Sequence, residues 1–185
     1  MPLAQAKVFY YDFVEIKPWI YELVISNLGL AFVGSKNSNI EASILGFYPN
    51  HILIQDSKKL APYVQQLKEY FAGKRRSFTV PIDYSSFGTP FQNKVVKMIE
   101  NIPYGTTISY RDLAASINGS TSVRSVAHAV ALNPSLIFIP SHRVVLAPDK
   151  VGSYRMGEKE KQRLINLEEG YLNAAKQTLS TFFWR

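Results

Sequence analysis

N-P-S-L-I-F-I-P-S-H-R-V-V, from Asn133 to Val145, is the stretch on which the interpretation of this 185-residue chain depends. It opens with an Asn-Pro turn signal, continues as an apolar run from Leu136 to Ile139, and stops at Pro140. A short apolar run bounded by prolines predicts a buried strand. Such a strand would deliver the polar residues that follow it to a fixed place at the edge of a core: Ser141, His142 and Arg143. Because buried polar groups cost free energy unless they are paired, this placement indicates a functional site.

The segment before this stretch is a helix-turn-helix candidate. Ser109 and Asp112 have the S-x-x-D spacing of a capping box, which predicts a helix that runs through Ile117. An Asn-Gly turn follows, and apolar residues at helical spacing from Val123 to Val130 predict a second helix. Two short helices joined by a glycine turn occur in DNA-binding proteins, and also in many small proteins that do not touch DNA.

The outer face of the second helix combines two long polar side chains with small ones. Arg124 and His128 are one helical turn apart, and small residues flank them: Ser125, Ala129 and Ala131. Small side chains let a helix backbone approach a partner closely, so Arg124 would project beyond that surface. An arginine that is simply solvated is the alternative interpretation. Thr121 or Ser122 can cap this helix.

The rest of the chain predicts an α+β protein. Strands over 8–16, 19–26, 30–33 and 51–54 and a helix over 57–72 form a small N-terminal α/β domain of sheet plus helix. Helices over 90–101, capped by Thr89, and over 158–169, closed by Gly170, join the helix pair. They form a mostly helical C-terminal domain with a winged-helix-like helix-turn-helix. We expect the domains to span 1–84 and 85–170, with a tail at 171–185 in which further helical structure is the alternative to a helix end at Gly170.

Composition restricts the class of protein. The net charge of +7 lies mostly in the second half of the chain, which suits nucleic acid or another anionic surface as well as a merely basic protein. There are no cysteines and the three histidines are scattered, so we expect no disulfide, no metal site and no cofactor. No run approaches the roughly 18 apolar residues of a membrane span. The N-terminus lacks a secretory pattern, so we expect the cytoplasm near the nucleoid, or the nucleus in a eukaryote.

Six linked motifs carry a resemblance to a known family. They are F-G-T-P-F-Q (87–92), I-P-Y-G-T-T-I-S-Y (102–110), R-S-V-A-H-A-V-A-L-N-P (124–134), I-P-S-H-R-V (139–144), V-G-S-Y-R-M-G (151–157) and K-Q-R-L-I-N-L-E (161–168). Their order and spacing resemble those of the O6-alkylguanine-DNA alkyltransferases, whose signature reads I-P-C-H-R-V. The resemblance spans roughly residues 68–170, and it implies a repair protein that takes an alkyl group from guanine onto its own cysteine.

The resemblance also implies how this chain would hold DNA. Arg124 matches the family's arginine finger, and Tyr110 matches the tyrosine that turns the nucleotide and faces the base. Asn133 matches the hinge asparagine between the recognition helix and the active-site segment. Further contacts to duplex DNA are expected on and beside the second helix: Thr121, Ser122, Ser125 and His128. The implied partner is double-stranded DNA with O6-alkylguanine, bound in the minor groove by a monomer, and no membrane is involved.

The same resemblance places a reaction site. Ser141 occupies the position of the family's nucleophilic cysteine, and His142 and Glu168 match the residues that draw its proton through a water. The guanine pocket would be lined by six residues: Tyr110, Val144, Val151, Tyr154, Arg155 and Lys161. Two smaller departures are Val96, where many members have Trp, and Met156, where Gly is common.

Serine at position 141 sets what the chain can do. Alkyl transfer is a displacement at saturated carbon by a thiolate, and a serine hydroxyl is both a weaker acid and a poorer nucleophile. We therefore expect Ser141 to allow DNA binding and base flipping but not transfer. The serine is either an introduced change from Cys, which we favour, or natural, as in an alkyltransferase-like lesion sensor. Natural nonreactive relatives usually carry Trp at this position.

Two alternative functions make different predictions. A serine hydrolase would use Ser141 and His142, but neighbours on a strand point to opposite faces, and no G-x-S-x-G elbow is present. A non-enzymatic helix-turn-helix regulator would read sequence in the major groove. The repair interpretation instead predicts weak sequence preference, salt-sensitive binding and tighter binding to lesion DNA.

Overall fold

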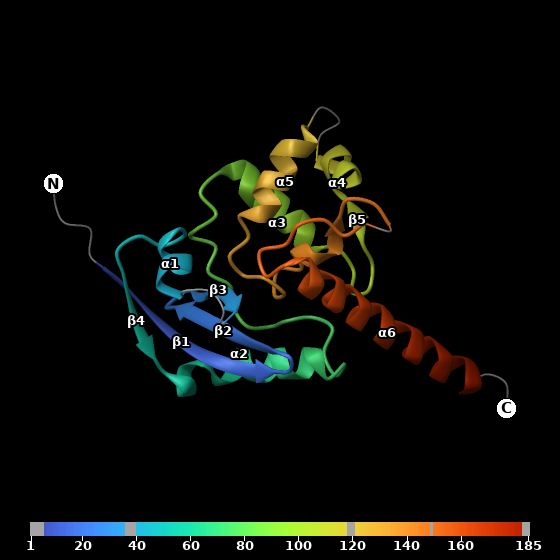
Figure 1. Ribbon diagram of the computed structural model, residues 1–185, viewed down its shortest axis with the longest axis horizontal. Helices are drawn as coiled ribbons and strands as arrows, with labels where there is room; N and C mark the ends of the chain where they lie inside the picture. Colours follow the sequence, from blue (N-terminus) through green and yellow to red (C-terminus); the bar gives the residue numbers. More distant parts are fainter. Residues whose placement is uncertain (1–5, 36–39, 118–120, 149, 183–185) are drawn as a thin grey trace. The chain divides into compact units, whose positions relative to one another are not determined.

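The computed structural model describes residues 6–35, 40–117, 121–148 and 150–182, with the backbone alone at position 40 and over 176–182. The chain divides into two compact units (Figure 1). The first comprises residues 1–93 and 132–138, and the second comprises residues 94–131 and 139–185. The predicted Asn118-Gly119 turn and the last three residues of the aromatic tail lie outside the described residues.

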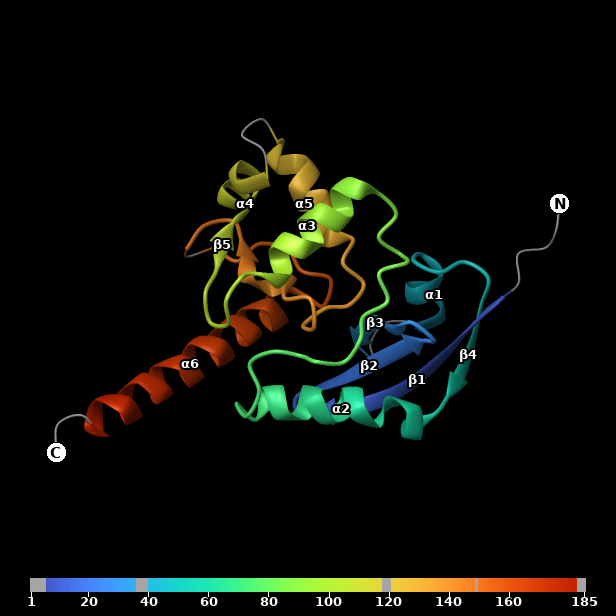
Figure 2. The same cartoon turned by 180° about the vertical axis from the view of Figure 1, so that it is seen from behind.

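The first unit is built on a four-stranded sheet with the order β3-β2-β1-β4. Pairing is antiparallel between β1 and β2 and between β2 and β3, and parallel between β1 and β4. Both views show α2 running alongside this sheet (Figures 1 and 2). The elements are β1 (Lys7–Ile16), β2 (Trp19–Ser26), β3 (Gly29–Ser35), α1 (Ile40–Leu45), β4 (His51–Gln55) and α2 (Ser57–Phe71).

Both faces of the sheet are covered, which explains the long apolar strands of this unit. Tyr21 on β2 packs against Phe71 of α2, with ring centroids 5.3 Å apart. On the other face a core cluster joins the sheet to α1 and the residues after it: Phe9, Val24, Ala31, Phe32, Ile44 and Tyr48. The predicted strands and the long helix are therefore present. The short helix α1 was missed, because six residues are too few to show a helical period.

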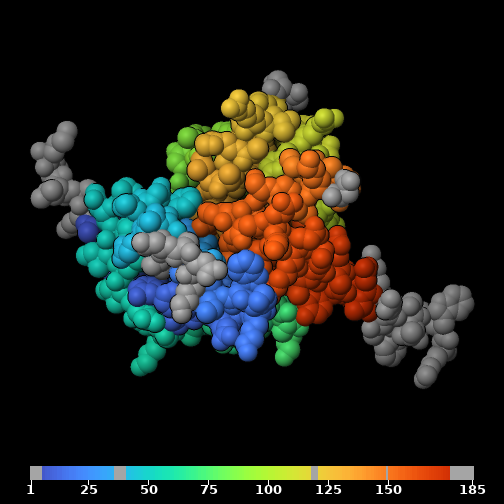
Figure 3. All heavy atoms as spheres, in the orientation of Figure 1, coloured from blue at the N-terminus to red at the C-terminus, as the bar shows by residue number. Residues whose placement is uncertain are grey.

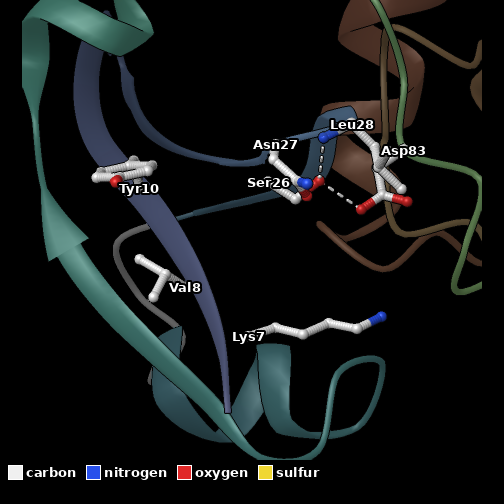
Figure 4. Close-up of a pocket in the computed structure, with 7 residues that line it drawn as sticks. All are labelled: Lys7, Val8, Tyr10, Ser26, Asn27, Leu28 and Asp83. Carbon is white, nitrogen blue, oxygen red and sulfur yellow. Dashed lines mark hydrogen bonds between the residues drawn. The ribbon is translucent and has the colours of Figure 1, made fainter. Parts of the chain in front are cut away.

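A hydrogen-bonded anchor joins the turn after β2 to the segment near Asp83. The Ser26 hydroxyl donates to Asp83 Oδ2 at 2.5 Å and accepts from the backbone N–H of Leu28 at 3.0 Å. Asp83 Oδ1 accepts from the backbone N–H of Ser85 at 2.8 Å. These groups form one wall of a cavity of about 520 Å³ that also contacts Lys7 (Figure 4). Because the wall's polar groups bond to one another, we assign the cluster a role in the fold.

Glu22 on β2 makes the stability of this unit depend on pH. Its side chain is 2% exposed, and its Oε2 has no hydrogen-bond partner among the described residues. Burial raises the pKa of Glu22 from 4.5 to about 7. The contribution of Glu22 to stability is therefore complete below pH 4.5 and lost as the pH rises through 7, because over that range only the unfolded chain ionises freely.

We expect Glu22→Gln to abolish this pH dependence. At pH 8 the variant should be more stable than the parent by up to about 3 kcal/mol, since one pKa unit corresponds to about 1.36 kcal/mol. At pH 4 the two proteins should be equally stable. Urea unfolding at both pH values measures the difference, with exposed Glu15→Gln on β1 as the control. A stability difference between the parent and Glu22→Gln that is the same at pH 8 as at pH 4, or a Glu15 variant with the same effect, would contradict the assignment.

The second unit is mostly helical and contains a two-stranded parallel pairing of β5 with β6. Two predicted helix caps are confirmed. Thr89 Oγ1 accepts from the N–H of Gln92 at 3.1 Å, and Ser109 Oγ accepts from the N–H of Asp112 at 3.0 Å. The elements are α3 (Pro90–Glu100, which begins in the first unit), β5 (Ile108–Ser109), α4 (Tyr110–Ile117), α5 (Val123–Ala131), η1 (Ser141–Arg143), β6 (Val144–Val145) and α6 (Glu158–Phe182).

The apolar run from Leu136 to Ile139 is not a strand, and that prediction is wrong. It is a buried turn in which Ile137 has φ +73°, a conformation that a β-branched residue rarely adopts. The preceding segment binds β3 instead, since the N–H of Val33 donates to Pro134 O at 2.9 Å. Phe138 stacks on Phe78 with ring centroids 4.0 Å apart. The run is apolar because it is buried on all sides, and composition alone does not distinguish such a turn from a strand.

The predicted end of the last helix at Gly170 is also wrong. α6 continues without a break to Phe182. An ideal Cβ on Gly170 would meet nothing within 4 Å, so neither a turn nor close packing requires glycine there. Glycine costs a helix about 1 kcal/mol relative to alanine, and the helix-favouring residues that follow offset this cost. Across the described part of the chain, no helix has the length and apolar character needed to span a membrane.

Candidate active site

Glu168 on α6 is the centre of a buried cluster in the second unit. Its Oε1 lies 3.0 Å from Nε2 of His142 and accepts from Nη2 of Arg143 at 2.8 Å. Its Oε2 accepts from Nε of Arg143 at 3.0 Å and from the backbone N–H of Gly105 at 2.8 Å. Glu168 and His142 are at most 1% exposed. Each oxygen of the Glu168 carboxylate thus contacts two different residues.

The short 3₁₀ helix η1 delivers His142 and Arg143 to this carboxylate. Ser141 begins the turn and is 2% exposed. Because these residues occupy a tight helical turn, the strand-based expectation that consecutive side chains point to opposite faces does not apply to them. Arg143 also donates from Nη1 to the carbonyl of Ile102 at 2.6 Å. The loop between α3 and β5 therefore contacts the cluster through Ile102 as well as through Gly105.

The charges of the cluster follow from its burial and its hydrogen bonds. Burial raises the pKa of Glu168, but the hydrogen bonds and charges of His142 and Arg143 outweigh this and lower the pKa to about 2. Burial lowers the pKa of His142 below its usual 6.5, against the opposing effect of Glu168. At neutral pH the pair is thus an ionised carboxylate and a neutral imidazole. Since the carboxylate only accepts, Nε2 of His142 carries the proton and Nδ1 carries the lone pair.

Lys161 and Tyr110 form a second buried pair in this unit. Lys161 is fully buried, and its Nζ lies 5.5 Å from the centre of the Tyr110 ring and 3.4 Å from the carbonyl of Ser153. Burial lowers the pKa of Lys161 to about 8, although Glu158 opposes the change. Burial also raises the pKa of Tyr110. The pKa of Lys161 is thus close to neutral pH, and its ammonium can supply a proton or a positive charge to this region.

Some of the other residues predicted to line the pocket are buried, and some are exposed. Val144 is fully buried in β6, and Val151 packs against Val145 and Ile165. Tyr154 is half-buried, whereas the side chain of Arg155 is exposed. The loop that bears them turns at Gly152, where φ is +77° and an added Cβ would contact Leu146 at 2.8 Å.

The predicted DNA-contacting residues lie on the solvent side of α5 or just before it, except for Tyr110, which is buried at the start of α4. Figure 3 shows side chains of this helix, in yellow, at the surface. Its buried stripe is Val126, Ala129 and Val130. Four residues predicted to contact DNA are exposed, namely Ser122, Arg124, Ser125 and His128, and Thr121 is partly exposed. The neighbouring helix α4 is fixed at its C-terminus, where Lys94 Nζ donates to the carbonyl of Ile117 at 3.2 Å.

Asn133 belongs to the first unit of the chain, whereas the cluster belongs to the second. It belongs to the segment 132–138 of the first unit and is fully buried. Its Oδ1 accepts from the N–H of Ser135 at 3.0 Å, which closes a local turn. The other predicted residues of the reaction site and the pocket belong to the second unit, where contacts join His142 to Glu168 and Lys161 to Tyr110.

Two members of the cluster were not predicted as site residues. Arg143 was noted as a polar residue after the apolar run, but its bidentate contact with Glu168 depends on packing between segments 25 residues apart. Gly105 stood in a Pro-Tyr-Gly turn signal, which predicted a turn but not its hydrogen bond to a carboxylate. The cluster can therefore act as a general base through the neutral imidazole of His142, which follows the Ser141 hydroxyl in the sequence.

Comparison with known proteins covers both parts of the chain. Residues 90–170 match the DNA binding domain of 6-O-methylguanine DNA methyltransferase, and residues 27–84 match its ribonuclease-like domain. The inducible methylated-DNA–protein-cysteine methyltransferase of Bacillus subtilis is 39% identical over 86% of this chain and 90% of its own. The crystal structure of Mycobacterium tuberculosis O6-methylguanine methyltransferase is 30% identical over 88% of this chain and 94% of its own, with a TM-score of 0.76. A structure of the M. tuberculosis protein in complex with DNA is 28% identical over 88% of this chain and 94% of its own, with a TM-score of 0.75.

Proposed function

This chain belongs to the 6-O-methylguanine DNA methyltransferase family, and from that premise we propose that it binds O6-alkylguanine in duplex DNA and holds the flipped base without taking its alkyl group. The observation that supports this most is the buried His142–Glu168–Arg143 cluster directly after Ser141. The cluster supplies a base, while residue 141 supplies a hydroxyl in place of the family's thiol.

Binding is proposed to use the exposed face of α5 in the minor groove. A base inside the duplex cannot reach a protein pocket, so it must rotate out of the stack. Minor-groove proteins that distort DNA fill the resulting gap with a side chain. Arg124 is exposed among small residues and fits that role, and Tyr110 lies at the start of the neighbouring helix, where it can face the extruded base. One chain per lesion is expected.

The flipped guanine is proposed to lie against Ser141, beside an intact proton relay of His142 and Glu168. His142 is neutral and its Nδ1 can accept a proton, directly or through a water. A cysteine in this place would become a thiolate, because its ordinary pKa is only about 8.5. A serine hydroxyl holds its proton far more tightly and attacks saturated carbon poorly. The chain then acts as a lesion-binding protein, whether the serine is natural or introduced.

A helix-turn-helix regulator is the second candidate function, and groove preference separates the two. A regulator would protect bases in the major groove at a defined sequence. The repair-type function predicts protection in the minor groove, little sequence preference and tighter binding to O6-methylguanine. Footprinting with probes for each groove, on lesion and undamaged duplexes of one sequence, distinguishes them.

Arg124→Ala should weaken binding to lesion DNA by about 1–3 kcal/mol, the usual cost of losing a specific arginine contact. The loss should be larger for a duplex with O6-methylguanine than for the undamaged duplex, because only the flipped complex leaves a gap to fill. Fluorescence anisotropy with both duplexes measures it. Lys159→Ala removes an equally exposed cation on α6 and serves as the control. If the two variants weaken binding equally, Arg124 contributes charge alone.

A further inference from the structure

The continuation of α6 past Gly170 places Leu172 against the loop that holds Glu168. Leu172 follows Glu168 by four residues, so the two side chains lie on one face of the helix. It lies beyond residue 170, where the match to the DNA binding domain ends. No role for Leu172 follows from the motifs in the sequence.

Gly105 is the residue that Leu172 touches. Gly105 has φ +71°, and an added Cβ would overlap Cδ1 of Leu172 and lie 3.3 Å from the carbonyl of Glu168. The backbone of Gly105 therefore lies directly on the helix, with the Leu172 side chain filling the space beside it. From that position its N–H reaches Oε2 of Glu168 at 2.8 Å.

The same loop binds the other partner of the carboxylate. The carbonyl of Ile102 accepts from Nη1 of Arg143 at 2.6 Å, and the Tyr104 ring lies 5.7 Å from the guanidinium carbon of Arg143. A displacement of the loop would thus move one hydrogen bond to Glu168 and one hydrogen bond to Arg143 together. Glu168 in turn fixes the proton of His142 on Nε2.

We propose that Leu172 is a positioning residue for the proton relay. It presses the loop of residues 102–105 onto α6, and thereby keeps the Gly105 N–H on Glu168 and bulk water away from the hydrogen bond between Glu168 and Nε2 of His142. The contact deepens the proposed function, because the relay matters only if the site handles a base. The contact itself, however, can be tested without DNA.

Leu172→Ala should loosen the loop while leaving the helix in place, because alanine favours helix. Amide hydrogen exchange at Gly105 should accelerate by about tenfold or more, measured relative to the Val95 amide in α3. The pKa of His142 should rise toward its ordinary value as water enters, and its ring should lose its single tautomer in ¹⁵N NMR spectra. Leu172→Met keeps the volume and should preserve both signals.

Ile165→Ala is the matched control on the same helix, since Ile165 packs against Val145 and Val151 instead of the loop. It should reduce global stability but leave the relative exchange of Gly105 and the titration of His142 unchanged. A second test combines Gly105→Ala with Leu172→Ala. If the two residues touch, the double variant should unfold less readily than the sum of the single effects predicts, by roughly tenfold in the unfolding equilibrium.

Unchanged Gly105 exchange and His142 titration in Leu172→Ala, or equal changes in Ile165→Ala, would overturn the inference. So would strict additivity of the Gly105 and Leu172 substitutions. All these measurements use the free protein. If the chain does not bind lesion DNA, the proposed function is wrong, but the measurements on Gly105 and His142 still test the contact of Leu172. If lesion binding is intact and those measurements show no change, only the role of Leu172 is wrong.

Discussion

Ser141→Cys is expected to convert this chain from a lesion-binding protein into one that removes the alkyl group. The new thiolate would attack the alkyl carbon, the bond from that carbon to O6 would break, and guanine would leave with the proton that His142 first accepts. Loss of a catalytic nucleophile costs several orders of magnitude in rate, so the parent should show no transfer on a timescale that labels the cysteine variant completely.

Tritiated O6-methylguanine in a duplex measures this result directly. The cysteine variant should retain close to one methyl group per chain after denaturing electrophoresis, and the parent and Ser141→Ala should retain none. Adding Glu168→Gln to the cysteine variant should slow transfer, because His142 then loses the carboxylate that fixes its proton. Stable label on the parent would mean that serine or another side chain accepts the alkyl group. A cysteine variant without label would mean that the site is not an alkyltransferase site.

The second large effect concerns Arg143, which makes three charge-assisted hydrogen bonds with a buried carboxylate. Arg143→Met should destabilise the protein by about 3–5 kcal/mol at pH 7, the usual cost of leaving a buried charge without its partner. Urea unfolding gives the value. Arg75→Met removes an arginine whose contact with Glu69 lies at the partly exposed surface, and there the cost should be far smaller, because water screens a surface ion pair.

The cost of Arg143→Met should also depend on pH. The pKa of Glu168 in the folded protein is about 2, below its ordinary 4.5. The stability contributed by the ionised carboxylate is thus present above pH 4.5 and lost as the pH falls toward 2. The parent and the variant should converge in acid, and Glu168→Gln should rescue part of the loss at pH 7. A constant difference between pH 7 and pH 3 would contradict this account of the cluster.

The sequence predicted those elements whose signals are local. Hydrogen bonds between neighbours set the caps at Thr89 and Ser109, and both caps are present in the structure. The apolar run before Ser141 was predicted as a strand, because composition reports burial but not the backbone dihedral of Ile137. Gly170 was predicted to end α6 because a glycine after a helical stripe commonly does so.

The site was predictable only where a motif names its members. Ser141 and His142 stand in one signature, but nothing in the local sequence joins Glu168 to Arg143 or to Gly105. Their meeting depends on how η1, α6 and the loop after α3 pack in three dimensions. The resemblance supplied Glu168, whereas the structure supplied the contacts that Arg143 and Gly105 make with it, and the place of Leu172. The contacts of Glu168 with Arg143, Gly105 and His142, which set the charge of Glu168 and the position of the His142 proton, could therefore not be predicted from sequence alone.

Binding of the unaltered Ser141 chain to paired duplexes tests the central claim most directly. One duplex would carry a single O6-methylguanine, and the other guanine at the same position, with dissociation constants measured at several salt concentrations. The account predicts tighter binding to the methylated duplex at every salt concentration and a methyl group still on the DNA afterwards. Equal affinity for the two duplexes, or a methyl group transferred to the protein, would contradict it.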